Sequence, residues 1–355
     1  MKRRALIFST AVCLTLFLLI LGPAMAAASP AHAAPQTFTV LVGWENPHQG
    51  IGLTAYFPDD LTVHVGDTVH WLQNSNEIHT VTFLGGLPIA DVPLIIFAPP
   101  GGLSPLMFNP EAVFPAPAPA AGLVDTSTFV NSGLMGRETG QARDFSVMFS
   151  AAGEYDYLCL VHGVMMSGKI TVVPAGTPIY SPQQALAQGR RQVAALLAQV
   201  PAVQRAANMQ IVPSVKNADG TKTHTVMIGY ASGQIDLMQF FPNTLRVRPG
   251  DTVHWELSPA NDAPHTVTFL NGTDDPPLAV FVAPLLYLNP AVLFPDGSDT
   301  LTRTGMFNSG LLAPGTPDTD YMLKIGSMAP GLLRYQCLLH DTSGMRGTLM
   351  VLPPR

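Results

Sequence analysis

The chain of 355 residues contains the same long sequence unit twice. Four pairs of segments recur in the same order: FTVLVGW at 38–44 and HTVMIGY at 224–230, VHVGDTVHW at 63–71 and VRPGDTVHW at 247–255, FNPEAVFP at 108–115 and LNPAVLFP at 288–295, FVNSGLM at 129–135 and MFNSGLL at 306–312. Because repetition at this scale determines the domain organisation, the sequence predicts two homologous domains, at residues 36–174 and 219–355.

Each repeat is predicted to consist of β-strands. Alternating Val, Thr and Phe residues form short segments bounded by Gly-Asp, Pro-Gly and Asn-Pro turns. The chain has 33 Pro and 31 Gly, and only 12% of its residues are charged, which also favours an all-β protein. About seven such strands in each repeat indicate a β-sandwich.

Residues 175–218 form the predicted linker, with a helix expected at 181–208. Ser181 can cap this helix, Pro182 suits its first position, and Pro201 interrupts it. We expect the helix to be a spacer that packs against one or both sandwiches. Two other long stretches, 84–146 and 270–326, have two possible roles. They are either irregular segments that complete the core, or a cap that shields a functional site or shapes a surface for a partner protein.

The amino terminus has the features of an export signal. Lys2, Arg3 and Arg4 precede an apolar run at 5–22, and small residues follow up to residue 33. We therefore expect residues 1–34 to be a signal peptide and the chain to be exported, either to the periplasm or to the extracellular space or cell surface. An uncleaved segment would instead hold the protein near a membrane. The net charge of −6 provides no basic footprint for nucleic acid.

Each repeat also carries a set of side chains that can bind a metal. The first set is His79, Cys159, His162 and one of Met165 and Met166; the second is His265, Cys337, His340 and Met345. A thiolate, two imidazoles and a thioether are the ligands of a mononuclear blue-copper site. After export the two cysteines could instead form a disulfide, but the local His and Met partners of each cysteine favour metal binding.

Around these residues the sequence resembles the cupredoxin family, specifically its plastocyanin and amicyanin branch. The resemblance is carried by GDTVHW and HTVTF in both repeats, and by YDYLCLVHGVMMSGKITV and RYQCLLHDTSGMRGTLMV. It implies two tandem cupredoxin-like Greek-key β-sandwiches joined by a short helical linker. It also implies one type 1 copper per domain, cycling between Cu(I) and Cu(II), with Met345 as the axial ligand in the second repeat.

Either of two neighbouring methionines could be the axial ligand of the first repeat. Met165 has the amicyanin spacing, whereas Met166 aligns better when counted back from Ser167-Gly168-Lys169. We expect Met166 to be the ligand. Because the ligand loop is shorter in this repeat, we also expect the two coppers to have different reduction potentials.

Three functions compete: electron transfer, catalysis by a copper enzyme of the nitrite reductase or two-domain laccase type, and copper storage or delivery. Such enzymes connect the blue site to a catalytic copper through a histidine next to the ligand cysteine. Here the flanking residues are Leu158, Leu160, Gln336 and Leu338, and the chain has no His-x-His pair. A buried four-ligand site also releases metal slowly. The sequence therefore predicts a non-enzymatic electron carrier with two coppers.

A redox partner protein of unknown identity is expected. In the resembling family, the histidine that follows the ligand cysteine lies near the surface, within an apolar patch where the partner docks. This implies docking at His162 and His340, although the adjoining pairs Leu160-Val161 and Leu338-Leu339 could equally be core. The acidic charge would steer a basic partner, and this effect would weaken with salt.

Overall fold

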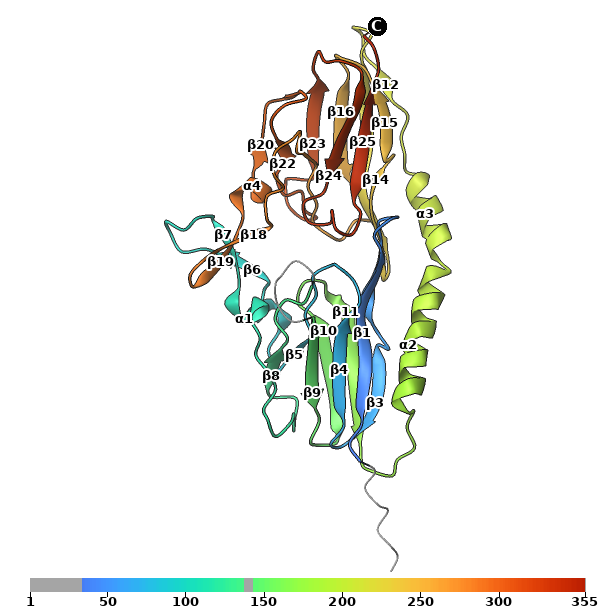
Figure 1. Cartoon of the computed structure of the whole chain (residues 1–355), viewed down its shortest axis with the longest axis vertical. Helices are drawn as coiled ribbons and strands as arrows, with labels where there is room; N and C mark the ends of the chain where they lie inside the picture. Colours follow the sequence, from blue (N-terminus) through green and yellow to red (C-terminus); the bar gives the residue numbers. More distant parts are fainter. Residues whose placement is uncertain (1–33, 137–142, 355) are drawn as a thin grey trace, which may run out of the picture. The chain divides into compact units, whose positions relative to one another are not determined.

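Two β-sandwiches, one from each repeat, make up the computed structural model of the chain (Figure 1). The structure describes residues 34–136 and 143–354, so positions 1–33 of the predicted signal peptide lie outside the described residues. Within the described part of the chain, no helix is long and apolar enough to span a membrane.

The first sandwich has two layers around an aromatic core. One layer contains β3 (Asp60–His64), β11 (Gly163–Val173), β10 (Gly153–Cys159), β5 (Thr82–Leu84) and β8 (Phe129–Asn131). The other contains β2 (Ile51–Phe57), β1 (Thr37–Asn46), β4 (Thr68–Gln73) and β9 (Asp144–Met148). Alternate residues of β4 face inward, as the strand period of two requires. Among them Trp71 is fully buried and packs edge-on against Phe83 and Tyr157.

The second sandwich repeats this arrangement. One layer contains β15 (Thr244–Val247), β25 (Arg346–Val351), β24 (Gly331–Gln336), β17 (Thr268–Phe269), β22 (Phe307–Ser309) and β20 (Pro295–Asp296). The other contains β14 (Ile235–Phe241), β13 (Lys222–Ser232), β16 (Thr252–Leu257), β23 (Asp320–Ile325) and β21 (Thr300–Leu301), with β12 (Val215–Lys216) beside β13. Trp255 packs edge-on against Phe269 and Tyr335. The predicted all-β fold of two tandem sandwiches is confirmed.

The same pairing rule holds in both repeats. β1 pairs antiparallel with β2 and parallel with β4. β13 likewise pairs antiparallel with β14 and parallel with β16. Within its own repeat, the second strand therefore pairs along one edge only, and its other edge is available to pair elsewhere.

The two repeats join through these equivalent edges. β2 pairs antiparallel with β14, so one sheet runs through both sandwiches. The register places Gly52 opposite Asp236, and these two residues hold the same position in the segments IGLTAYF and IDLMQFF. An interface in which each partner presents the same element has the form of a two-fold dimer. Gly52 and Asp236 therefore mark a pseudo-two-fold axis between the repeats.

A second junction lies in the long stretches between the strands. The hairpin of β6 (Ile95–Phe97) and β7 (Leu106–Phe108) joins the hairpin of β18 (Ala279–Val282) and β19 (Leu285–Leu288) in a four-stranded sheet. Met107 pairs with Tyr287, again two equivalent positions. The short helices η1 (Ile89–Asp91), α1 (Pro110–Val113) and α4 (Pro290–Leu293) belong to the same stretches. These stretches thus join the repeats as well as extending their cores.

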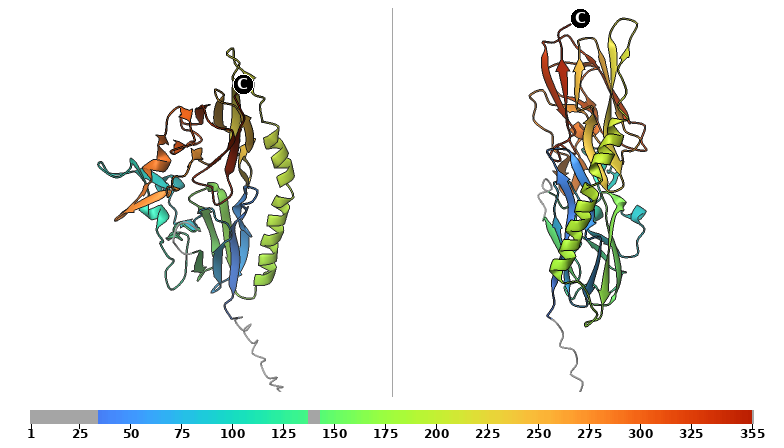
Figure 2. Two further views of the ribbon diagram at one scale, coloured as in Figure 1. Left: turned by 45° about the horizontal axis from the view of Figure 1, so that its top comes forward. Right: turned by 90° about the vertical axis from the view of Figure 1, so that its right-hand side faces the viewer.

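The predicted helical spacer is two consecutive helices, α2 (Pro182–Leu197) and α3 (Val200–Asn208). Ser181 and Gln184 form a capping box at the start of α2, and Pro201 lies in the first turn of α3. α2 contacts β1 and β2, whereas α3 contacts β13 and β14 (Figure 2). The spacer therefore packs against both sandwiches, through one apolar cluster that both share.

Gly189 lies where α2 touches the end of β2. A Cβ at this position would stand 2.5 Å from the carbonyl carbon of Phe57 and 2.6 Å from the nitrogen of Pro58. Alanine would gain about 1 kcal/mol of helix propensity, but overpacking against backbone costs about 1–3 kcal/mol. We expect Gly189→Ala to lower the free energy of unfolding in guanidinium titrations. The exposed Ala195→Gly measures propensity alone in the same helix, and a stabilised Gly189→Ala would contradict the close contact.

Candidate metal centres

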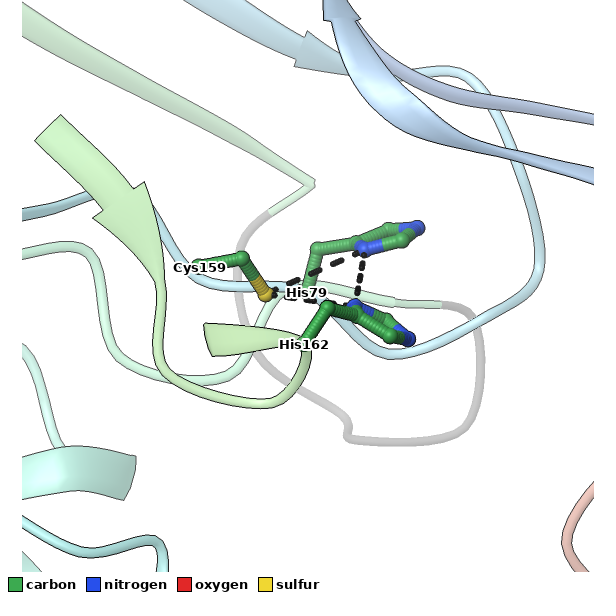
Figure 3. A group of neighbouring side chains, drawn as sticks. All are labelled: His79, Cys159 and His162. Carbon is green, nitrogen blue, oxygen red and sulfur yellow. Dashed lines mark hydrogen bonds between the residues drawn. The ribbon is translucent and has the colours of Figure 1, made fainter. Parts of the chain in front are cut away.

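The first cluster brings together three side chains from distant parts of the first repeat (Figure 3). His79 precedes β5, Cys159 ends β10, and His162 lies in the turn before β11. The Nδ1 atoms of His79 and His162 are 3.3 Å apart, and the Cys159 Sγ lies 3.4 Å from His162 Nδ1 and 4.0 Å from His79 Nδ1. His79 and Cys159 are fully buried, and His162 is partly buried.

The second cluster has the same atoms in nearly the same arrangement. His265 Nδ1 lies 3.1 Å from His340 Nδ1, and the Cys337 Sγ lies 3.4 Å from His340 Nδ1 and 3.7 Å from His265 Nδ1. All three side chains are buried. Across residues 34–136 and 143–354, these are the two groups of three or more metal-ligating side chains whose ligand atoms converge.

The donor separations suit a single metal ion in each cluster. With bonds of about 2.0 Å to nitrogen and about 2.3 Å to sulfur, a trigonal set of donors stands about 3.5–3.7 Å apart. The observed separations of 3.1–4.0 Å bracket that range. Two imidazoles and one thiolate are the equatorial donors of a blue-copper site, so the residues present fit a copper ion.

The methionines differ in their placement. Met166 and Met345 are fully buried and belong to the same core clusters as Cys159 and Cys337, respectively. Met165 is 54% exposed. Of the two candidates in the first repeat, Met166 is therefore the one on the cysteine's side of the fold.

Comparison with known proteins agrees with this donor set. Residues 46–173 match the family model of copper-binding proteins of the plastocyanin/azurin family. The first repeat is therefore similar to this family over the matched residues. The match covers the turn that holds Cys159 and His162 and the strand that begins at Gly163.

Solved structures that resemble the chain come from the same family. Amicyanin from Paracoccus versutus is 20% identical, covering 41% of this chain and 87% of its own, with a TM-score of 0.21. Plastocyanin from Dryopteris crassirhizoma is 21% identical, covering 36% of this chain and 99% of its own, with a TM-score of 0.22.

In both repeats a polar side chain lies within hydrogen-bond distance of Nε2 of the first histidine. Ser75 Oγ lies 3.0 Å from His79 Nε2, and Asn261 Oδ1 lies 2.8 Å from His265 Nε2. A partner at Nε2 fixes the ring orientation and leaves Nδ1 to face the metal. The cysteine sulfurs each accept a backbone hydrogen bond, from Thr80 N–H at 3.3 Å and Thr266 N–H at 3.4 Å.

A buried hydrogen-bond chain supports the cysteine turn of the first repeat. Leu160 N–H donates to Thr80 Oγ1, which lies 2.9 Å from Thr82 Oγ1, and Thr82 in turn donates to Asn131 Oδ1. Asn131 Nδ2 donates to the carbonyl oxygens of Glu111 and Ala112. The second repeat contains the equivalent chain through Thr266, Thr268 and Asn308. The repeated Thr and Asn residues thus connect the site to the short helices α1 and α4.

Glu77 gives the first repeat a carboxylate that the second lacks, since Ala263 holds the equivalent position. Its Oε1 lies 3.3 Å from His162 Nε2. Burial alone would raise the pKa of the Glu77 carboxyl, but the charge of His162 and its hydrogen bond lower it to about 2. Burial likewise opposes ionisation of Cys159, yet His162 lowers the pKa of that thiol well below its usual value.

The second cluster has the opposite electrostatics. Burial raises the pKa of the Cys337 thiol to about 11. Burial also lowers the pKa of His265 and of His340. The metal-free clusters therefore differ in charge: the first favours a thiolate beside an imidazolium, and the second favours a neutral thiol beside neutral imidazoles.

The two histidines that follow the ligand cysteines, His162 and His340, are called the edge histidines here. They do not face an open apolar patch, contrary to the expectation for partner docking. His162 and His340 both line one cavity of about 260 Å³ between the repeats. Val161 and Leu339 line it too, and the neighbouring Leu160 and Leu338 are buried. The reason is the pseudo-two-fold junction, because it turns the equivalent ends of the two sandwiches toward each other.

Asp236 lies at this junction and is buried, with one carboxylate oxygen, Oδ1, lacking a hydrogen-bond partner in the described structure. Burial raises its pKa well above the usual value; Glu77 and Asp262 add to this, while His162 opposes it. Since the folded chain keeps this proton to a higher pH than the unfolded chain, the contribution of Asp236 to stability falls as pH rises above about 4.

We therefore expect Asp236→Asn to raise the free energy of unfolding at neutral pH. The gain should shrink as the pH is lowered toward about 4, where the unfolded carboxyl also becomes protonated. Urea unfolding at several pH values measures this difference. A gain that is independent of pH would contradict burial of a titrating carboxyl.

The sequence pattern did not identify Ser75, Asn261, Glu77 or Asp236. Ser75 and Asn261 both stand four residues before the first histidine, but they differ in type, so the repeat gives no match. In the alignment of the two repeats, Glu77 corresponds to Ala263 and Asp236 corresponds to Gly52. The sequence signal that could have identified Glu77 and Asp236 is a mismatch between the repeats: one copy has a carboxylate where the other has a small residue.

Proposed function

We propose that the chain is an exported blue copper protein that holds one type 1 copper in each repeat and acts in one-electron transfer. The proposed ligands are His79, Cys159, His162, Met166, His265, Cys337, His340 and Met345. The observation that carries the proposal is the pair of His–Cys–His clusters, which present the same donor atoms at separations that suit one ion.

The surrounding residues suit that role. A bound copper would supply a centre that alternates between Cu(I) and Cu(II). Ser75 and Asn261 orient the first histidine of each site, and the Thr80 and Thr266 N–H groups stabilise negative charge on the cysteine sulfur. Because the strands fix these groups before metal binds, little rearrangement is expected when the electron moves.

The organisation and setting are part of the proposal. We take residues 1–34 as the signal peptide, 36–174 and 219–355 as the two copper domains, and 175–218 as the linker. A redox partner protein in the periplasm or outside the cell would exchange electrons with the chain. Because the edge histidines line an inter-repeat cavity, we expect this partner to contact a different surface.

The second candidate is a copper-dependent oxidoreductase, because the cavity between the two clusters has room for a small molecule. The residues that flank the cysteines weigh against a nitrite reductase or laccase arrangement, since Leu158, Leu160, Gln336 and Leu338 occupy the positions where a histidine would connect two coppers. Storage or delivery is the third candidate.

Spectroelectrochemistry of the copper-loaded chain tests the proposal. We expect two reversible one-electron steps that bleach the visible band, at different potentials because the axial loops and the Glu77/Ala263 position differ between repeats. A single potential for both coppers would contradict the predicted inequality. Consumption of oxygen or nitrite by the reduced protein would favour the oxidoreductase.

A further inference from the structure

We propose that the cavity between the repeats is a binding site for a small organic cation, an ammonium group carried on an apolar body. This site is additional to the two clusters, and it does not depend on the identity of the metal they bind. It lies on the pseudo-two-fold axis, lined by His162 and His340.

The charge of the cavity favours a cation. Glu77, Asp236 and Asp262 line it, and its described lining residues include no lysine or arginine. A buried carboxylate without a counter-charge is costly, and for this reason burial raises the pKa of Asp236. An ammonium group bound beside Asp236 would stabilise its ionised form.

Asp236 is the feature that points to a ligand. Its side chain is buried and lines the cavity, and its Oδ1 has no hydrogen-bond partner in the described structure. Buried polar atoms in folded proteins almost always have partners. On the opposite strand, a Cβ at Gly52 would lie 3.8 Å from Glu77 Oε2 and 3.9 Å from the Asp236 Cβ. The Met238 Cε would lie closer still, at 2.8 Å, so the absence of a side chain at Gly52 lets Met238, Glu77 and Asp236 pack together at the junction.

The remaining walls are apolar. Ile95, Phe108, Leu278, Leu288 and Leu311 are among them. An apolar cavity of about 150 Å³ holds benzene, so 260 Å³ accommodates a ring with a short ammonium arm. A chelated metal ion fits less well, because in the described part of the chain neither convergent group of metal-ligating side chains includes Asp236.

Isothermal titration calorimetry of the full chain with benzylammonium, and with benzyl alcohol as the neutral molecule of similar size, tests the site. We expect benzylammonium to bind at one site per chain, about tenfold or more tighter than benzyl alcohol. The alcohol can still donate one hydrogen bond, but it lacks the positive charge that strengthens a hydrogen bond to a carboxylate. The metal-free protein should keep this preference, which excludes coordination of the amine by a metal.

Two variants and a control locate the binding. Asp236→Asn and Glu77→Gln should each reduce benzylammonium affinity by about tenfold. Asp144→Asn should leave it unchanged, since Asp144 pairs with His70 on the surface away from the cavity. The proposal would be overturned if benzylammonium did not bind, or if it bound no more tightly than benzyl alcohol. It would also be overturned if Asp144→Asn lost as much benzylammonium affinity as the other two variants. None of these results depends on whether the chain binds copper.

Discussion

Replacing Cys159 with serine is expected to reduce the copper content from two ions to one per chain and to remove the visible charge-transfer band of the first repeat. The thiolate is the soft ligand on which a type 1 site depends, and a serine hydroxyl does not replace it. Cys159 is fully buried at the end of β10, so the smaller, similarly shaped serine should leave the sandwich folded. Metal analysis per chain and the visible spectrum measure the result.

Cys337→Ser is the matched variant in the second repeat. It should remove the other copper and leave the first band, and the double variant should be colourless. Circular dichroism checks that each variant is folded. If Cys159→Ser lost both coppers, or kept both bands, two independent sites would be excluded.

Replacing Trp71 with alanine is expected to cost about 3–5 kcal/mol in the free energy of unfolding, as for other large core aromatics. The indole is fully buried and packs against Phe83 and Tyr157 in the centre of the first sandwich. A loss of this size is a large share of the roughly 5–15 kcal/mol that stabilises a typical protein. Trp255→Ala should have a similar cost in the second sandwich, where Trp255 makes the equivalent contacts.

Phe97→Ala provides the control, because Phe97 is 86% exposed on the β6 hairpin. Its cost should stay within about 0.5 kcal/mol. Guanidinium unfolding followed by far-UV circular dichroism compares the three variants. If Trp71→Ala cost no more than Phe97→Ala, the proposed packing of the core would be wrong.

Much of the fold could be predicted because the repeated segments can be recognised directly in the sequence. GDTVHW and HTVTF carry the strand alternation twice, and the structure places His79 with Cys159 and His265 with Cys337 as that pattern indicated. Ser181, Pro182 and Pro201 likewise predicted the start of α2 and its interruption. These signals are local, so one sequence suffices to read them.

The junction between the repeats could not be predicted in the same way. It depends on edge pairing between β2 and β14, and no short-range pattern specifies which free edge meets which. The burial of His340 and the shared cavity follow from that pairing. For this reason the expected docking patch became an internal wall, and Asp236 acquired a position that its sequence neighbours did not indicate.

The copper content of the purified, copper-loaded chain, measured together with its visible spectrum, tests whether the protein holds two type 1 coppers. We expect two coppers per chain and an intense thiolate-to-copper charge-transfer band that disappears on reduction and returns on oxidation. One copper or none per chain, or a copper-loaded protein without that band, would contradict it.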